Sequence, residues 1–499
     1  MTPGASFPVR LVSRFCMSEK SNSFDYESLP PRRLPKVIDE ETFKRSSFVK
    51  NAPEQEEPLF APKEPLSERP VENKPLNNAQ PSKTTINDQS AFEWIVKSGH
   101  SVSFAGLFIF TCLVFFRPYE LAPSLSWLSQ SAFYVAVSTI VVFLFSQLGL
   151  ENRLTARPRE VILILLLLVT AALSIPKAVD PMRAWGSFVD FLKVVLIFIV
   201  MVNVLRTEKR LRTLFMLSLL AGCVLSVSAI SDYWTGRLAL QGLRIKGSIG
   251  GLFDNPNDLA LHLVTAIPLA VALLFDSRNL FTKLFYGAVG ILMVGGLIAT
   301  FSRGGFLGMA CAAVILFWRI AGKNKWLLGI FLPIAFAVMI VVGPAGYLSR
   351  LATTNDGSAV ARTADLKRSI YVALHHPLLG IGMNNYTLYS DNGLATHNAY
   401  TQVGVELGLA AMVFYTLFLI TPLRHLRRIA KETSSNRKKS LFYLAVGIEA
   451  SLIGYMVSSF FGSVAYLWYA YYLVAYGVCL RRLYATRDVS KPKPTFLAI

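Results

Sequence analysis

The stretch Val161-Ile-Leu-Ile-Leu-Leu-Leu-Leu-Val-Thr-Ala-Ala-Leu-Ser-Ile175 contains no charged side chain. An α-helix rises 1.5 Å per residue, so a helix over 160–175 approaches the roughly 30 Å thickness of the hydrocarbon core of a bilayer. A helix that is apolar all round is not expected on the surface of a soluble protein. The stretch therefore predicts a membrane-spanning helix.

Apolar runs of this kind recur along the chain and predict about twelve transmembrane helices. The expected spans are 101–116, 131–149, 160–175, 187–205, 212–231, 258–275, 284–300, 304–320, 326–345, 401–423, 441–461 and 463–480. The composition agrees, because 53% of the 499 residues are hydrophobic and the mean hydropathy is +0.45. The sequence thus predicts an all-α polytopic membrane protein with a long loop, 346–400, between the ninth and tenth helices.

Residues 1–97 have a different composition, with 12 of the 25 prolines, charges of both signs and few large apolar residues. Such a segment cannot offset its ordering entropy by burial, so it is expected to be a disordered tail. The transmembrane domain is then expected over 98–483, followed by a short tail, 484–499.

The distribution of Lys and Arg predicts the orientation of the chain. With a cytoplasmic N-terminal tail, the inner loops hold 24 basic residues and the outer loops 11. This asymmetry follows the positive-inside rule. It also accounts for the formal net charge of +19 through anionic lipid, without a nucleic-acid partner. Loop 346–400 is then expected on the outer face, together with 233–257 and the start of the eighth helix.

The unusual polar residues gather on this predicted outer face. Arg303 lies in Thr300-Phe-Ser-Arg-Gly-Gly-Phe306, where two apolar runs meet, and His397 lies in Thr396-His-Asn-Ala-Tyr400. Arg362 begins an amphipathic helix expected near 362–375, and Arg244 precedes Lys246 in the 233–257 loop. Arginines in such positions either contact lipid phosphates or hold an anionic ligand.

Other polar residues of the apolar helices have structural interpretations. Asp258 is a candidate cap for the sixth helix, and either Asn398 or Thr396 for the tenth. His262 is expected in the core, while Glu406 is expected to have a structural partner. No spacing of His, Cys or carboxylate residues predicts a metal site.

Four motifs in this order resemble the O-antigen ligase superfamily, which includes Wzy-type polymerases. They are Arg244-Ile-Lys-Gly247 leading to Phe253-Asp-Asn-Pro-Asn-Asp-Leu-Ala260, Phe301-Ser-Arg-Gly-Gly305, Arg362 leading to His376-Pro-Leu-Leu-Gly-Ile-Gly382, and His397-Asn-Ala-Tyr400 leading to Glu406-Leu-Gly408. The resemblance covers about 100–480.

The resemblance implies a bacterial inner-membrane glycosyltransferase with its site on the periplasmic face. The donor would be a glycan on undecaprenyl pyrophosphate, the acceptor a glycan or lipid A-core of lipopolysaccharide, and no metal or other cofactor would be needed. By matching position, Arg303 and Arg362 would bind the donor pyrophosphate, with Arg244 as a possible third residue. His397, together with Arg303, would be catalytic.

The chemistry of the residues agrees with this implication. Arginines hold the charge of a departing pyrophosphate without losing their protons, and a neutral histidine can accept the proton of an attacking hydroxyl. A ligase, a polymerase of lipid-linked repeats and, in another class, a polysaccharide transporter or flippase remain alternatives. Transporters often show internal repeats and broken helices with midplane charges, which the sequence does not show.

Overall fold

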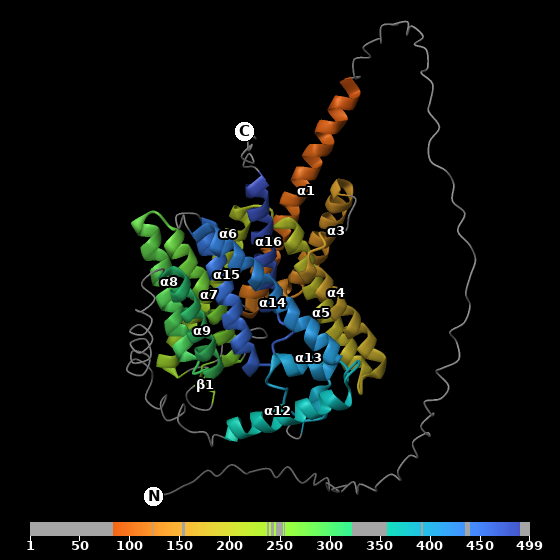
Figure 1. The fold of residues 1–499 in the computed structure, drawn as a ribbon, viewed down its shortest axis with the longest axis vertical. Helices are drawn as coiled ribbons and strands as arrows, with labels where there is room; N and C mark the ends of the chain where they lie inside the picture. Colours follow the sequence, from red (N-terminus) through yellow and green to blue (C-terminus); the bar gives the residue numbers. More distant parts are fainter. Residues whose placement is uncertain are drawn as a thin grey trace, which may run out of the picture. The chain divides into compact units, whose positions relative to one another are not determined.

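The computed structural model describes residues 83–121, 123–151, 155–236, 239–240, 244–245, 253, 255–321, 357–390, 393–434 and 440–489. The expected span 326–345 and most of the N-terminal tail lie outside these residues. Apart from one small hairpin, the secondary structure is helical (Figure 1). The longer helices are α1 (Lys83–Phe116), α3 (Ser131–Glu151), α4 (Arg159–Ser174), α5 (Pro181–Val204), α6 (Glu208–Thr235), α7 (Pro256–Asp276), α8 (Leu280–Ala299), α9 (Arg303–Ile320), α12 (Gly357–His375), α13 (Ala399–Leu407), α14 (Leu409–Thr433), α15 (Ser440–Ser458) and α16 (Trp468–Val489).

Ten helices in the described part of the chain are long and apolar enough to cross a membrane. Their outer surfaces carry large apolar side chains, such as Phe145 and Ile291, each 77% exposed. In water this surface would promote aggregation, whereas in lipid it needs no partner. The prediction of an all-α polytopic membrane protein is confirmed.

The expected tenth helix, 401–423, is wrong in one respect. The structure divides this run into α13 and α14 at Gly408, whose φ is 95°. The cause is a close approach, because a Cβ at Gly408 would lie 2.4 Å from the carbonyl oxygen of Leu378. Hydropathy is continuous through the break and gives no sign of it.

The ends of the chain also differ from expectation. Helix α1 begins at Lys83, within the segment expected to be disordered to residue 97, and α16 continues past the expected end of the domain at residue 483. Pro81 is the last proline before Pro118, so no missing N–H group interrupts a helix between them. Helix α16 begins five residues after the start of the expected span 463–480, and it is not among the ten helices that are apolar enough to cross a membrane.

Helices α7 and α15 form the centre of the bundle, with 78% and 72% of their spans buried. Small residues bring α9 and α7 against α15. A Cβ at Gly308 of α9 would lie 2.7 Å from the carbonyl oxygen of Gly454, and a Cβ at Gly447 would lie 2.5 Å from Ala272 Cβ. Packing of small residues is a main source of helix association in lipid. It fixes α9, which carries Arg303 in its first turn.

Two matched substitutions test this packing. Gly308→Ala places a methyl group 2.0 Å from Ser458 Oγ, and overpacking of this kind typically costs about 1–3 kcal/mol. Gly290→Ala on α8 has no atom within 4 Å and gains helix propensity, up to about 1 kcal/mol. Thermal unfolding in detergent should show a lower midpoint for Gly308→Ala and an unchanged or higher one for Gly290→Ala. Equal midpoints for the two variants would contradict the close α9–α15 contact.

Candidate functional site

Helix α9 begins at the site because its first residues cap and pack it. Ser302 is the N-cap, with its Oγ accepting a hydrogen bond from the Gly305 N–H at 3.2 Å and donating to Asn257 Oδ1 at 2.9 Å. Gly304 lies against Phe461, where a Cβ would approach Phe461 Cβ to 2.7 Å. These contacts join the starts of α7 and α9, where Arg303 is half-buried.

His397 precedes α13 in a strained conformation. Its φ is 52°, a region that costs about 1–3 kcal/mol for residues other than glycine. The backbone N–H donates to Ser463 Oγ at 2.8 Å, and Thr396 Oγ1 lies 3.0 Å from the same oxygen. Asn398 caps α13 by accepting from the N–H groups of Tyr400 and Thr401. The loop before α16 thus holds His397 in place, and the expectation that Asn398 or Thr396 caps this helix is confirmed for Asn398.

Helix α12 places Arg362 in the same site. In Figure 1, α12 crosses the end of the bundle where α13 and strand β1 (Ala239–Leu240) lie. Arg362 is half-buried, and its charge interacts with both Arg303 and His397. In the described part of the chain Arg362 forms no ion pair and donates no hydrogen bond. Two like charges held close together at half-buried positions repel each other, and an anion between them would relieve that repulsion.

The loop after α12 is docked on the α13–α14 junction by main-chain hydrogen bonds. Ile381 N donates to Val405 O, Gly382 N donates to Glu406 O, and Leu409 N donates to Pro377 O, at 2.8–3.0 Å. Gly380 makes this possible with a φ of 63°, since a Cβ there would lie 2.4 Å from Val405 O.

Asp365 was missed by the sequence analysis. It lies one turn after Arg362, is 4% exposed, and interacts electrostatically with His397. Its Oδ1 accepts from Ser390 Oγ at 3.3 Å, while no hydrogen bond to Oδ2 forms in the described part of the chain. The spacing of three residues from Arg362 on one helix was the available signal. Ser463 gave none, because it lies 66 residues from His397.

The electrostatics favour a neutral His397. Burial lowers the pKa of the imidazole, the nearby Arg362 lowers it further, and Asp365 opposes this by raising it. Burial and Arg303 also lower the pKa of Arg362, which nevertheless stays protonated because guanidinium pKa values lie above 12. The site thus combines fixed positive charge with an imidazole that is available as a base at neutral pH.

The main chain of Arg244 forms part of a short antiparallel hairpin, in which β1 (Ala239–Leu240) pairs with β2 (Arg244–Ile245). The structure does not describe the side chain of Arg244, nor residues Lys246 and Asp254, so the role of Arg244 stays a prediction.

The expectation that Asp258 caps α7 is wrong. Asn255 is the N-cap and accepts from Asn257 N at 2.9 Å, because Pro256 occupies the first helical position.

His262 has the core position expected from the sequence, whereas Glu406 Oε2 forms no hydrogen bond in the described part of the chain. His262 is 1% exposed, is packed among aromatic rings, and its Nε2 lies 3.2 Å from Ser218 O. Glu406 is 3% exposed beside the Asn384 N–H and the Tyr466 hydroxyl, and burial raises its pKa to about 8. A protonated Glu406 adds no charge to the anion site.

No group of three His, Cys, Asp or Glu side chains in the described ranges is placed to hold a metal ion.

Comparison with known proteins connects this geometry to a family. A family model described as O-antigen ligase matches residues 288–416, while the curated proteins contain no match to the chain. The matched part includes Arg303, Arg362 and His397 and three of the four motifs. The match covers less than half of the chain and supports its resemblance to the O-antigen ligase and Wzy-type polymerase superfamily.

Proposed function

We propose that the protein transfers a glycan from undecaprenyl pyrophosphate to an acceptor hydroxyl, as an O-antigen ligase, at the periplasmic face of a bacterial inner membrane. The observation that carries the proposal is the convergence of Arg303, Arg362 and His397 at one end of the helix bundle, from three separate elements. A lipid-linked pyrophosphate presents its charge at the membrane surface, where these residues lie in a multi-pass protein.

The reaction assigns one task to each group. His397 accepts the proton of the acceptor hydroxyl, and the hydroxyl oxygen bonds to the anomeric carbon of the donor glycan. The bond from that carbon to the pyrophosphate oxygen breaks, and undecaprenyl pyrophosphate leaves with the electron pair. Arg303 and Arg362 hold the negative charge as it develops, which is typically worth about 3–4 kcal/mol per well-placed donor in an oxyanion site.

Asp365 is a positioning residue in this scheme. Its buried carboxylate interacts electrostatically with His397 and favours the imidazolium that forms when the histidine takes a proton. The main-chain N–H of His397 donates a hydrogen bond to Ser463 Oγ. This bond fixes the residue without using either nitrogen of the imidazole ring. Both ring nitrogens then remain available for the acceptor and for Asp365.

Donor binding and turnover should separate in variants. Arg303→Lys and Arg362→Lys lose the planar two-point grip on phosphate, so the Kd for a lipid-linked donor should rise about tenfold or more. His397→Ala should keep donor affinity but lose about 10²–10⁴-fold in turnover. Binding to purified variants measures this, with Arg424→Lys at the far end of α14 as the matched control. Donor affinity lost equally in His397→Ala would make the histidine an anion ligand.

The pH dependence follows from the lowered pKa of His397. A base with a lowered pKa stays neutral to lower pH, so kcat/KM should fall only below about pH 6.5, the ordinary value for histidine. Asp365→Asn removes the group that raises this pKa, so the acidic limb should move to still lower pH. Asp190→Asn, an exposed control on α5, should leave the limb in place. A shift of the limb to higher pH in Asp365→Asn is incompatible with the proposed contact.

The acceptor distinguishes a ligase from the alternatives. A deletion strain is examined by glycan gel, with the chromosomal copy restored as the control. Loss of attachment, with full-length polymer retained on its lipid carrier, is the expected result. Loss of long chains would instead show a polymerase of lipid-linked repeats, and accumulation of the lipid-linked glycan on the cytoplasmic side would show a flippase.

A further inference from the structure

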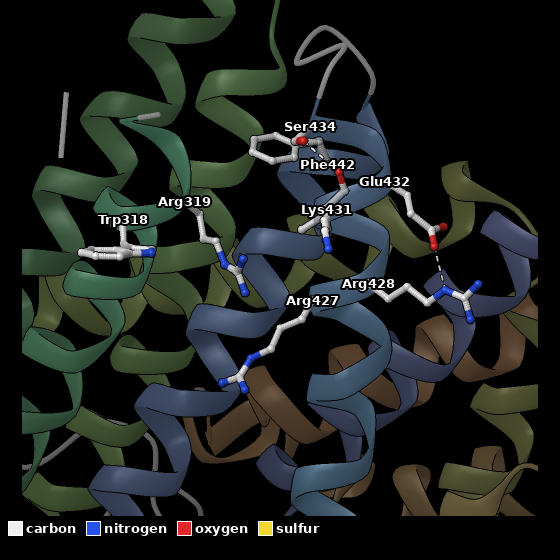
Figure 2. A pocket seen from close by; sticks show the side chains of 9 residues that line it. Trp318, Arg319, Arg427, Arg428, Lys431, Glu432, Ser434 and Phe442 are labelled. Carbon is white, nitrogen blue, oxygen red and sulfur yellow. Dashed lines mark hydrogen bonds and ion pairs between the residues drawn. The ribbon is translucent and has the colours of Figure 1, made fainter. Parts of the chain in front are cut away.

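A second cationic cavity lies at the other end of α9. Arg303 begins this helix and Arg319 ends it, so at 1.5 Å per residue the two are about 24 Å apart. The cavity has a volume of about 850 Å³ between α9, the end of α14 and the start of α15, and no motif of the family accounts for it. Its lining is Trp318, Arg319, Arg427, Arg428, Ala430, Lys431, Glu432, Ser434 and Phe442 (Figure 2).

The buried carboxylate of Glu449 organises two of the cations. Arg319 donates from Nε and Nη2 to both oxygens of Glu449, at 3.1 and 2.9 Å. Arg427 donates only its Nε hydrogen, at 2.9 Å. Glu449 is 1% exposed, whereas the side chain of Arg427 is 52% exposed. One carboxylate therefore holds two guanidinium groups, and the Nη groups of Arg427 have no acceptor in the described part of the chain.

The cavity has an excess of positive charge. Lys431 forms no ion pair within the described ranges, and Arg428 is neutralised by Glu432 at 2.7 Å. In Figure 2 the nitrogen ends of Arg319, Arg427 and Lys431 lie between α9 and α14, while Arg428 extends away from them toward Glu432. The four cations and two carboxylates, Glu432 and Glu449, leave a net side-chain charge of +2.

The position of the cavity selects a lipid over a soluble anion. It opens at the ends of helices that span the membrane, and Trp318, which is 50% exposed, marks the level at which tryptophans lie at an interface. Phe442 adds an apolar wall. Basic pockets between transmembrane helices at this depth suit the phosphates of lipid headgroups.

We propose that this cavity binds the phosphate headgroup of an anionic phospholipid, in the leaflet opposite the His397 site. A lipid with two phosphates, such as cardiolipin, matches the net charge of +2. The Nη groups of Arg427 and the ammonium group of Lys431 donate to the phosphate oxygens, while Arg319 stays on Glu449. The acyl chains extend into the bilayer along α9 and α14.

The test titrates purified protein in a neutral detergent with cardiolipin, phosphatidylglycerol, phosphatidylcholine or inorganic phosphate, and reads the bound species by native mass spectrometry. Cardiolipin should bind in preference to phosphatidylcholine. In the double variant Arg427→Gln, Lys431→Gln the Kd for cardiolipin should rise about tenfold or more, since each basic residue near a lipid headgroup is worth about 1 kcal/mol. Arg319 still pairs with Glu449 in this variant.

The matched control is the double variant Arg424→Gln, Lys283→Gln, which removes the same charge from exposed positions outside the cavity. It should change the Kd less than twofold. Lys431→Gln alone touches no described ion pair and should give an intermediate loss even if the double variant folds poorly. An equal loss of cardiolipin affinity in the two double variants would show that binding depends on the overall charge of the protein and not on this cavity. Preference for inorganic phosphate over cardiolipin, or binding of phosphatidylcholine as tightly as cardiolipin, would overturn the lipid assignment.

Discussion

The site depends on one backbone contact, the docking of residues 377–382 against residues 405–409. Three main-chain hydrogen bonds join a loop that follows α12 to the turn between α13 and α14. Gly380, Gly382 and Gly408 all have positive φ there, and each would clash with a neighbour if it carried a Cβ. The motif that ends at Gly382 and the motif that ends at Gly408 thus pack against each other, and we call this contact the joint. Because this joint carries no chemistry itself, its function is to hold α12, with Arg362 and Asp365, over His397.

Strained backbone conformations occur beside the residues of the candidate site. Four residues other than glycine have positive φ in the described part of the chain, and Phe301, Asn384 and His397 are three of them. Phe301 turns the chain from α8 into the cap of α9, Asn384 follows the docked loop, and His397 precedes α13. Each is held by tight turns or by neighbouring elements, which is the condition under which such conformations persist. A site assembled from three separate elements needs these sharp turns to aim its side chains at one point.

The sequence predicts what is local and misses what is tertiary. Expected spans such as 160–175 and 304–320 agree closely with Arg159–Ser174 and Arg303–Ile320, because hydropathy alone places a helix in lipid. The sequence singles out Arg303 and His397 because polar residues at the ends of apolar runs are conspicuous, and Arg362 because it begins an amphipathic helix. The break at Gly408 was missed because α13 and α14 are both apolar, and its cause is a carbonyl from the distant residue Leu378. Ser463 was missed for the same reason, since only folding brings it to His397.

Some arginines in this bundle stabilise the fold by pairing with a buried carboxylate, and others are available to bind a ligand. The two kinds differ in whether a buried carboxylate pairs with them. Arg481 pairs with the buried Glu160, and Arg319 pairs with the buried Glu449. A buried carboxylate without such a partner would be costly, so these arginines are required for stability. At the His397 site the charge of Arg303 instead lowers the pKa of Arg362, and Arg362 forms no ion pair in the described part of the chain. The repulsion between these two cations is unfavourable for folding, and an anionic ligand would relieve it on binding. Arg427 is intermediate, since it shares a carboxylate that Arg319 already satisfies. The number of cations per buried carboxylate therefore distinguishes arginines that stabilise the fold from arginines that are available to bind.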